Sequence, residues 1–145
     1  MTEQQVGAAL ATVALFAGLE PRELDALAAL AFTKTFQPGD AIVEEGHTGN
    51  GLYIVLEGRV EVIKGEASGR PQVLATFGPG EPFGELALLG EWKRTATVRA
   101  IDETRCLGMD RWLFLAHIER EPTVAIKMLQ FIAQRLVDTD ARLSG

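Results

Sequence analysis

The chain has 145 residues, of which 47% are hydrophobic and 23% are charged. A domain of this size buries enough surface to fold without disulfides or structural metals, so an intrinsically disordered chain is excluded. Its 14 Lys and Arg residues against 20 Asp and Glu residues give a net charge of −6. Because nucleic-acid phosphates are bound by clustered Lys and Arg side chains, direct nucleic-acid binding is not expected.

The sequence carries no sign of a membrane, redox or metal function. Residues 7–19 form a mostly apolar run that lacks a basic flank and is too short to span a bilayer, so a buried helix is predicted. Cys106 is the only cysteine and lies in an apolar stretch, which indicates a buried structural thiol in a reducing cytoplasm. His47 and His117 lie far apart without further ligands at metal spacing, so no metal site is predicted. No catalytic residue is predicted either, because Ser68, Ser144 and Cys106 have no nearby base in the sequence.

Residues 1–34 are predicted to form the N-terminal helices. Residues 6–16 are rich in Ala and Leu, and Gly18 and Pro21 separate them from a second helix that runs to about Phe32. The apolar residues of this second helix recur at helical spacing: they are Leu24, Leu27, Ala28 and Ala31. Such a stripe requires a packing partner elsewhere in the chain.

Residues 35–109 change to short β-prone runs that are separated by glycine and other turn residues. The predicted strand regions are 36–40, 41–44, 52–56, 60–64, 72–77, 96–101 and 104–109, with a polar hairpin loop at 65–71. Short strands at regular spacing, with turn signals between them, are typical of a β-sandwich or barrel.

Residues 110–145 are predicted to be helical again. Asp110 can cap a helix that runs to about Glu119, and Pro122 lies early in a final helix that runs to Leu143. Four apolar residues and one threonine recur along this final helix at heptad spacing: Leu129, Ile132, Leu136, Thr139 and Leu143. Two interpretations stay open: the helix packs on its own β-domain, or it forms a homodimer.

The segment 83–98 carries the residues with the clearest chemistry. Gly84 allows close backbone approach, and Glu85 begins a short predicted helix whose free N–H groups attract an anion. Arg94 enters the next strand with a guanidinium that can hold a phosphate through two parallel hydrogen bonds. A carboxylate and a guanidinium together suit a ligand with both a hydroxyl and a phosphate, although a simple ion pair in a turn explains the same two residues.

This segment resembles the phosphate-binding cassette of the cyclic nucleotide-binding domain family. The matching motifs are Phe-Gly-Glu-Leu-Ala-Leu at residues 83–88 and Arg-Thr-Ala-Thr-Val at residues 94–98. Further landmarks of the family lie at residues 15–19, 36–40, 45–46 and 52–58. The resemblance therefore covers nearly the whole chain, which would form a single domain. It implies an α+β fold, in which a jelly-roll of about eight antiparallel strands is flanked by N-terminal helices and by C-terminal hinge and lid helices.

The resemblance also implies roles for individual residues. Glu85 would accept a hydrogen bond from the ribose 2′-hydroxyl, and Arg94 would pair with the cyclic phosphate. Backbone N–H groups would complete the phosphate and sugar cage at Gly84, Leu86, Ala87, Thr95 and Ala96. Val62 and Leu74 would flank the base from two strands. The sequence departs from the kinase members at Trp92 and Lys93, where that group often has Pro before the arginine. Trp92 either covers the ligand or packs on the adjacent strand.

The identity of the base depends on three residues. Thr95 lies where cyclic GMP-selective members often carry Thr, and Asp140 lies where some channels place an acid that reads guanine. Thr139 resembles the helix threonine that contacts adenine in the catabolite activator protein, and many bacterial members carry Arg-Thr-Ala-Thr. We expect the ligand to be cyclic AMP, with only a slight preference over cyclic GMP, because cyclic AMP is the commoner ligand of the family.

The resemblance predicts a cytoplasmic regulatory domain of signal transduction and not an enzyme. It would bind a 3′,5′-cyclic purine nucleotide without a cofactor and would signal, through movement of the C-terminal helix, to an effector protein or domain that the sequence does not identify. The chain stops about where that helix ends, so either a stand-alone sensor or an excised domain is expected. Two alternatives remain: a degenerate member that serves as a protein-interaction module without nucleotide, and a jelly-roll enzyme of cupin type.

Overall fold

The computed structural model describes residues 2–66 and 68–144 of the chain. Its helices, 3₁₀ helices (η) and strands are, in chain order, α1 (Glu3–Leu10), η1 (Ala14–Phe16), α2 (Pro21–Ala28), β1 (Phe32–Phe36), β2 (Ala41–Val43), β3 (Gly51–Glu57), β4 (Val60–Lys64), β5 (Gln72–Phe77), β6 (Pro82–Phe83), η2 (Glu85–Leu88), β7 (Thr97–Ala100), β8 (Thr104–Asp110), α3 (Arg111–Arg120) and α4 (Pro122–Ser144).

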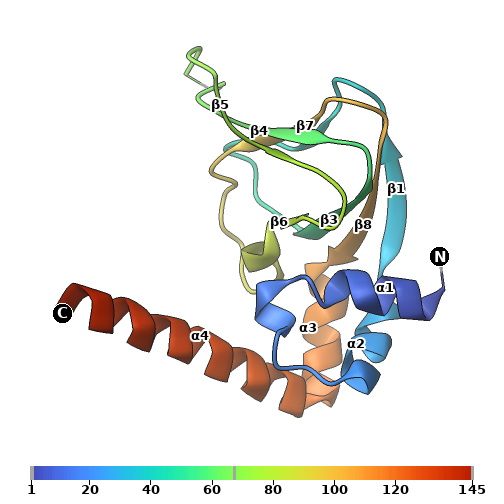
Figure 1. Cartoon of the computed structure of the whole chain (residues 1–145), viewed down its shortest axis with the longest axis vertical. Helices are drawn as coiled ribbons and strands as arrows, with labels where there is room; N and C mark the ends of the chain where they lie inside the picture. The colour runs from blue at the N-terminus through green and yellow to red at the C-terminus, as the bar shows by residue number, and fades with distance from the viewer. Residues whose placement is uncertain (1, 67, 145) are drawn as a thin grey trace.

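Within the described residues, eight strands form two antiparallel sheets that together make a roll (Figure 1). The first sheet has the strand order β1-β8-β3-β6, and the second has the order β2-β7-β4-β5. Helices α1, α2 and α3 lie together at one end of the roll, and α4 leads away from them (Figure 1). The predicted α+β class, with a jelly-roll of about eight antiparallel strands and helices at both ends of the chain, is confirmed.

The central strands of the first sheet contribute to two cores. On β3, Leu52 and Ile54 belong to the cluster shared with the helices, whereas Val55 packs between the two sheets. On β8, Leu107 belongs to the helical cluster, and Cys106 lies in a smaller cluster with β1 and β7. This division follows from strand geometry, because successive side chains of a strand point to opposite faces.

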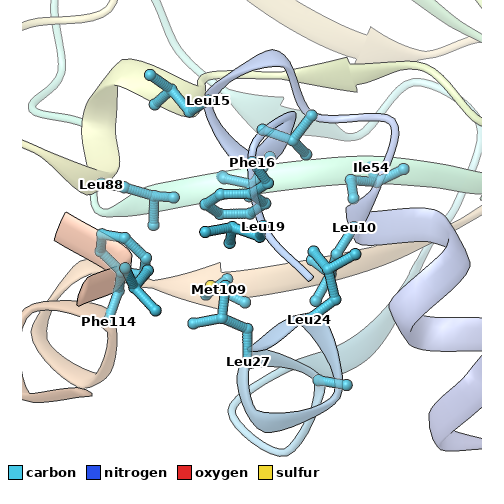
Figure 2. Packing of buried hydrophobic residues seen from close by; sticks show 14 of the residues in the cluster. Leu10, Leu15, Phe16, Leu19, Leu24, Leu27, Ile54, Leu88, Met109 and Phe114 are labelled. Carbon is cyan, nitrogen blue, oxygen red and sulfur yellow. The ribbon is translucent and has the colours of Figure 1, made fainter. Parts of the chain in front are cut away.

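The larger core lies between the helices and this sheet, as Figure 2 shows. The stripe predicted on the second helix supplies Leu24, Leu27 and Ala28 to it. Phe16 of η1 packs against Phe114 of α3, with ring centroids 6.0 Å apart. Burial of each large apolar side chain contributes about 1.5–3 kcal/mol to folding, so this core fixes the helices on the end of the roll.

The C-terminal helices begin where the sequence predicts. The carboxylate of Asp110 caps α3, because it accepts hydrogen bonds from the N–H groups of Trp112 and Leu113. Pro122 is the first residue of α4, where its fixed φ and missing N–H do no harm.

Only the first half of α4 is attached to the domain. Val124 and Met128 are buried in the helical core, and Nζ of Lys127 lies 2.5 Å from the carboxylate of Glu23 on α2. Residues 133–142 are exposed, and this part of the helix extends away from the roll (Figure 1). Among the described residues, no helix combines the length and the apolar character that a bilayer crossing requires.

Several boundaries differ from the sequence-based prediction, and the largest differences are in the first third of the chain and at β6. The helix predicted over residues 6–16 is divided into α1 and η1, because the hydroxyl of Thr12 donates back to the backbone and Val13 is extended. The second helix ends at Ala28 and not near Phe32, and the first strand spans Phe32–Phe36 and not 36–40, because β8 pairs with the chain from Phe32 to Phe36. The sequence does not predict β6, since a strand of two residues has no periodic pattern.

Candidate functional site

The loop between β6 and β7 forms the centre of the candidate site. Gly84 adopts the left-handed conformation, with φ 77°, directly before η2. A Cβ atom at this position would collide with Nη1 of Arg94, so the site needs glycine both for the turn and for the close approach of the arginine. The short helix predicted to begin at Glu85 is present as η2.

Arg94 reaches this loop from a backbone that is fixed to the β2–β3 connection. Its N–H donates to the carbonyl of His47 at 2.8 Å, and its own carbonyl accepts from the N–H of Gly46 at 2.9 Å. The side chain donates through Nη2 to the carbonyl of Gly51 at 2.7 Å, and through Nη1 to the carbonyl of Gly84 at a longer 3.5 Å. Its Nε is buried and has no hydrogen bond partner in the part of the chain that the structure describes.

The guanidinium of Arg94 places a partly desolvated charge in the site. Burial lowers the pKa of Arg94 from its usual value; Tyr53 partly offsets this shift, and the neighbouring cation of Arg111 adds to it. Arginine nevertheless stays protonated in proteins, so the charge is present at neutral pH. Its acceptors are two neutral carbonyls, and an anion would satisfy this group better than they do.

Glu85 supplies a buried acceptor in the same loop. Its Oε2 is buried and has no hydrogen bond partner among the described residues. Arg94 donates to backbone carbonyls instead of to Glu85, so the simple ion pair considered from the sequence is not formed in this structure. A buried acceptor without a donor costs at least about 1–3 kcal/mol, and a ligand hydroxyl would remove this cost.

Glu85 and Arg94 line one pocket of about 310 Å³. Its lining residues are Gly84, Glu85, Leu86, Ala87, Trp92, Lys93, Arg94 and Thr95. All of them except Trp92 and Lys93 are site residues predicted from the sequence. The volume is at the lower end of the range of small-molecule sites.

A second pocket, of about 420 Å³, shares Arg94 with the first and is lined by β2, the following loop and Tyr53. The carboxylate in its lining is that of Glu44, which is exposed and lies 3.2 Å from Nε2 of His47. We take the smaller pocket as the candidate site, because its carboxylate is buried and lacks a donor.

Five predicted site residues lie outside the smaller pocket. Ala96 is half-buried immediately before β7, and Val62 is half-buried in the cluster between the sheets. Leu74 is exposed on β5, at a register shift in the β4–β5 pair. Thr139 and Asp140 are exposed on the half of α4 that extends away from the roll (Figure 1). The roles given to these five residues stay predictions.

The backbone of η2 adds one condition for ligand binding. The N–H of Ala87 donates to the carbonyl of Gly84 at 3.1 Å, as the geometry of a 3₁₀ turn requires. A phosphate that accepts from Ala87, as the resemblance implies, would therefore require a rearrangement of this turn.

Sequence reasoning did not include two residues that surround Arg94. At Gly49, an added Cβ would lie 2.6 Å from Nε of Arg94, so only a glycine at this position of the β2–β3 loop leaves room for the guanidinium. Arg111, the first residue of α3, is buried beside this loop. The run Gly-Asn-Gly at residues 49–51 is a sequence signal for close backbone approach, whereas no sequence pattern marks Arg111 as buried.

Cys106 has the structural role predicted for it. The side chain is fully buried between the sheets, and burial raises the pKa of its thiol to about 12. A thiol with this pKa stays protonated at neutral pH and is a poor nucleophile.

The fold and the pocket together define a small β-roll that can hold a ligand with an anionic group and a hydroxyl. The family model for the cyclic nucleotide-binding domain matches residues 33–121 of the chain. The chain therefore belongs to the cyclic nucleotide-binding domain family, a family of regulatory domains, and the resemblance found in segment 83–98 is confirmed.

Comparison with individual proteins supports the same family. The Cyclic AMP receptor protein of Thermus thermophilus is 36% identical over 129 residues, which are 89% of this chain and 60% of that protein. The crystal structure of the N-terminal domain of a transcriptional regulator from Streptomyces coelicolor has a TM-score of 0.83 and 33% identity, and the match covers 93% of this chain and 94% of that one. The structure of cAMP-bound PfPKA-R has a TM-score of 0.71 and 32% identity over 79% of this chain and 40% of that one.

These relatives include bacterial proteins, as the form of the Arg-Thr-Ala-Thr motif predicts. The chain spans about 60% of the length of the first curated relatives that it matches.

Proposed function

We propose that the chain binds a 3′,5′-cyclic purine nucleotide in the pocket of Glu85 and Arg94. The observation that carries this proposal is a buried carboxylate oxygen without a donor beside a partly desolvated guanidinium. A ribose hydroxyl can donate to Glu85, and the anionic cyclic phosphate can accept from Arg94. The nucleotide is the ligand, and the function requires no cofactor and no catalytic residue.

Cyclic AMP is the nucleotide that we expect to bind more tightly. Support comes from two of the relatives, because one is a cyclic AMP receptor protein and the other was solved with cAMP bound. Thr95 lines the pocket and remains the residue that would favour cyclic GMP. Thr139 and Asp140 would contact a base only after α4 moves towards the roll.

The output that we propose is this movement of α4. A ligand shifts an equilibrium only between states that it binds with different affinity, so the helix must cover the base in one state and not in the other. The buried residues of α4 lie near its start, which makes that end the pivot, and the exposed residues 133–142 are the part that can swing.

A homodimer and an effector would receive this movement. Leu129 and Leu136 are 65% and 62% exposed at heptad spacing, which suits a second copy of the same helix. The effector itself is a protein or domain. We expect the 145-residue chain to have no direct contact with nucleic acid and to function in the cytoplasm.

The first experiment is a calorimetric titration with cyclic AMP and cyclic GMP, with 5′-AMP as the control for the cyclic phosphate. We expect saturable binding of at least one cyclic nucleotide at micromolar concentration or below, and little or no binding of 5′-AMP. The ratio of the two cyclic nucleotide affinities then decides the base. Absence of binding by either cyclic nucleotide would contradict the proposal and would favour a protein-interaction module.

A further inference from the structure

Arg111 is a buried arginine that connects α3 to distant parts of the chain. Only 3% of its surface is exposed. Its Nη1 lies within hydrogen-bond distance of three backbone carbonyls, those of Gly49 at 2.7 Å, Gly90 at 3.0 Å and Ala87 at 3.3 Å. Its backbone N–H donates to the carbonyl of Asn50 at 2.8 Å.

These acceptors belong to two segments on either side of Arg94: Ala87 lines the pocket of Glu85 and Arg94, whereas Gly49 and Asn50 line the neighbouring pocket that shares Arg94. Gly49 and Asn50 lie in the β2–β3 loop, whereas Ala87 and Gly90 lie in and just after η2. The nearest carboxylate, that of Glu91, is 3.5 Å away and largely exposed, so carbonyls are the main partners of this charge. Because a buried guanidinium is tolerated only while its N–H groups have acceptors, the start of α3 is tied to both segments.

Gly49 connects this cluster to the arginine of the pocket. Its carbonyl accepts from Arg111, while a Cβ on its other side would lie 2.6 Å from Nε and 2.7 Å from Cζ of Arg94. A phosphate bound by Arg94 would compete with the present acceptors of the guanidinium, the carbonyls of Gly51 and Gly84. A movement of the Arg94 side chain on binding would change its close approach to Gly49, whose carbonyl accepts from Arg111.

We propose that Arg111 is a positioning residue that transmits occupancy of the Glu85–Arg94 pocket to α3, and through α3 to α4. This inference rests on the proposed function of that pocket. A shift of η2 or of the 49–51 loop moves the carbonyls that hold the guanidinium, and the first turn of α3 moves with it.

The test is hydrogen exchange, measured by mass spectrometry on the whole chain with and without saturating cyclic AMP. The variants are Arg111→Lys, which keeps the charge but not the planar fork, and Arg111→Gln, which keeps donors but not the charge. Arg105→Lys is the matched control, because Arg105 lies on β8 and pairs with Glu57 at the surface. Calorimetry of each variant separates nucleotide affinity from transmission.

In the wild type, we expect cyclic AMP to slow exchange in the cassette, in the 49–51 loop and in the first turns of α3. In Arg111→Lys, the cassette response should persist while the α3 response falls by about 10-fold or more, the factor expected for loss of one hydrogen bond to a charged group. Arg111→Gln should behave similarly, and Arg105→Lys should match the wild type. If Arg111 had only a structural role, its replacement would lower stability and would not selectively remove the α3 response to cyclic AMP.

Transmission to α3 at the wild-type level in either Arg111 variant would overturn the proposal. If both variants fail to fold, the wild type still tests the proposal. A cassette response without any response in residues 49–51 and 111–114 would also overturn it. Failure of the wild type to bind any cyclic nucleotide is a different result, because it contradicts the proposed function itself.

Discussion

Arg94→Ala is the substitution that tests the proposed site most directly. In the structure, this side chain donates to two neutral carbonyls, one at 2.7 Å and one at a weak 3.5 Å. A phosphate would offer Arg94 charge-assisted hydrogen bonds in a partly desolvated place. Loss of one hydrogen bond to a charged group costs about 1.5–3 kcal/mol, which corresponds to roughly 10- to 150-fold weaker binding of cyclic AMP. Arg94→Lys keeps the charge without the planar fork and should recover only part of this loss.

The assay is calorimetry of the wild type and both variants at one salt concentration, with thermal unfolding as a check of the fold. Arg59→Ala is the matched control, because Arg59 is an exposed arginine that pairs with Asp102. We expect the control to bind cyclic AMP as the wild type does. An Arg94→Ala variant that also binds with wild-type affinity would remove Arg94 from the site and refute the reasoning.

Three further predictions concern specificity, pH dependence and reactivity. Thr95→Ala should weaken cyclic GMP more than cyclic AMP in parallel titrations, and equal weakening would exclude Thr95 as a reader of guanine. Glu23→Gln should lower the free energy of unfolding at pH 7 by about 1.5–3 kcal/mol, because the N–H of Glu20 and then Lys127 lower the pKa of Glu23 below its usual 4.5. A lowered pKa stabilises the fold only while the carboxylate is ionised, so urea unfolding should show this difference shrinking as the pH falls through the pKa of the folded state. Cys106, with a pKa of about 12, should react with a thiol reagent at pH 8 far more slowly in the native protein than in urea, and equal rates would show that it is accessible.

The fold could be predicted from the sequence where the pattern is local. Prediction and structure agree over Val60–Lys64 and Gln72–Phe77, because β-prone runs with glycine turns between them define both ends of each strand. The agreement ends where tertiary contacts set the boundary. Phe32 is in a strand because Gly108 of β8 is its partner, and a two-residue strand at Pro82–Phe83 exists only because β3 is beside it.

The candidate site divides in the same way. Glu85 and Arg94 could be predicted together, because one short segment of chain carries both and both line the same pocket. Gly49 and Arg111 reach the same place from the β2–β3 loop and from the end of β8, and no local pattern relates them to the cassette. Leu74 illustrates a third limit, since a register shift on β5 changes which side chain faces the roll and gives no signal in the sequence.

The heptad spacing of α4 continues into the exposed half of the helix, which needs a surface to pack on. Val124 and Met128 are buried in the core, whereas residues 133–142 are exposed along their whole length. A helical segment this short is only marginally stable without tertiary packing, so Leu136 and its neighbours need a surface to pack on. The roll around a bound nucleotide and a second copy of α4 are the two surfaces that the proposed function provides. Because both compete for the same marginal segment, a ligand needs to favour one arrangement by only a few kcal/mol to change the position of the helix.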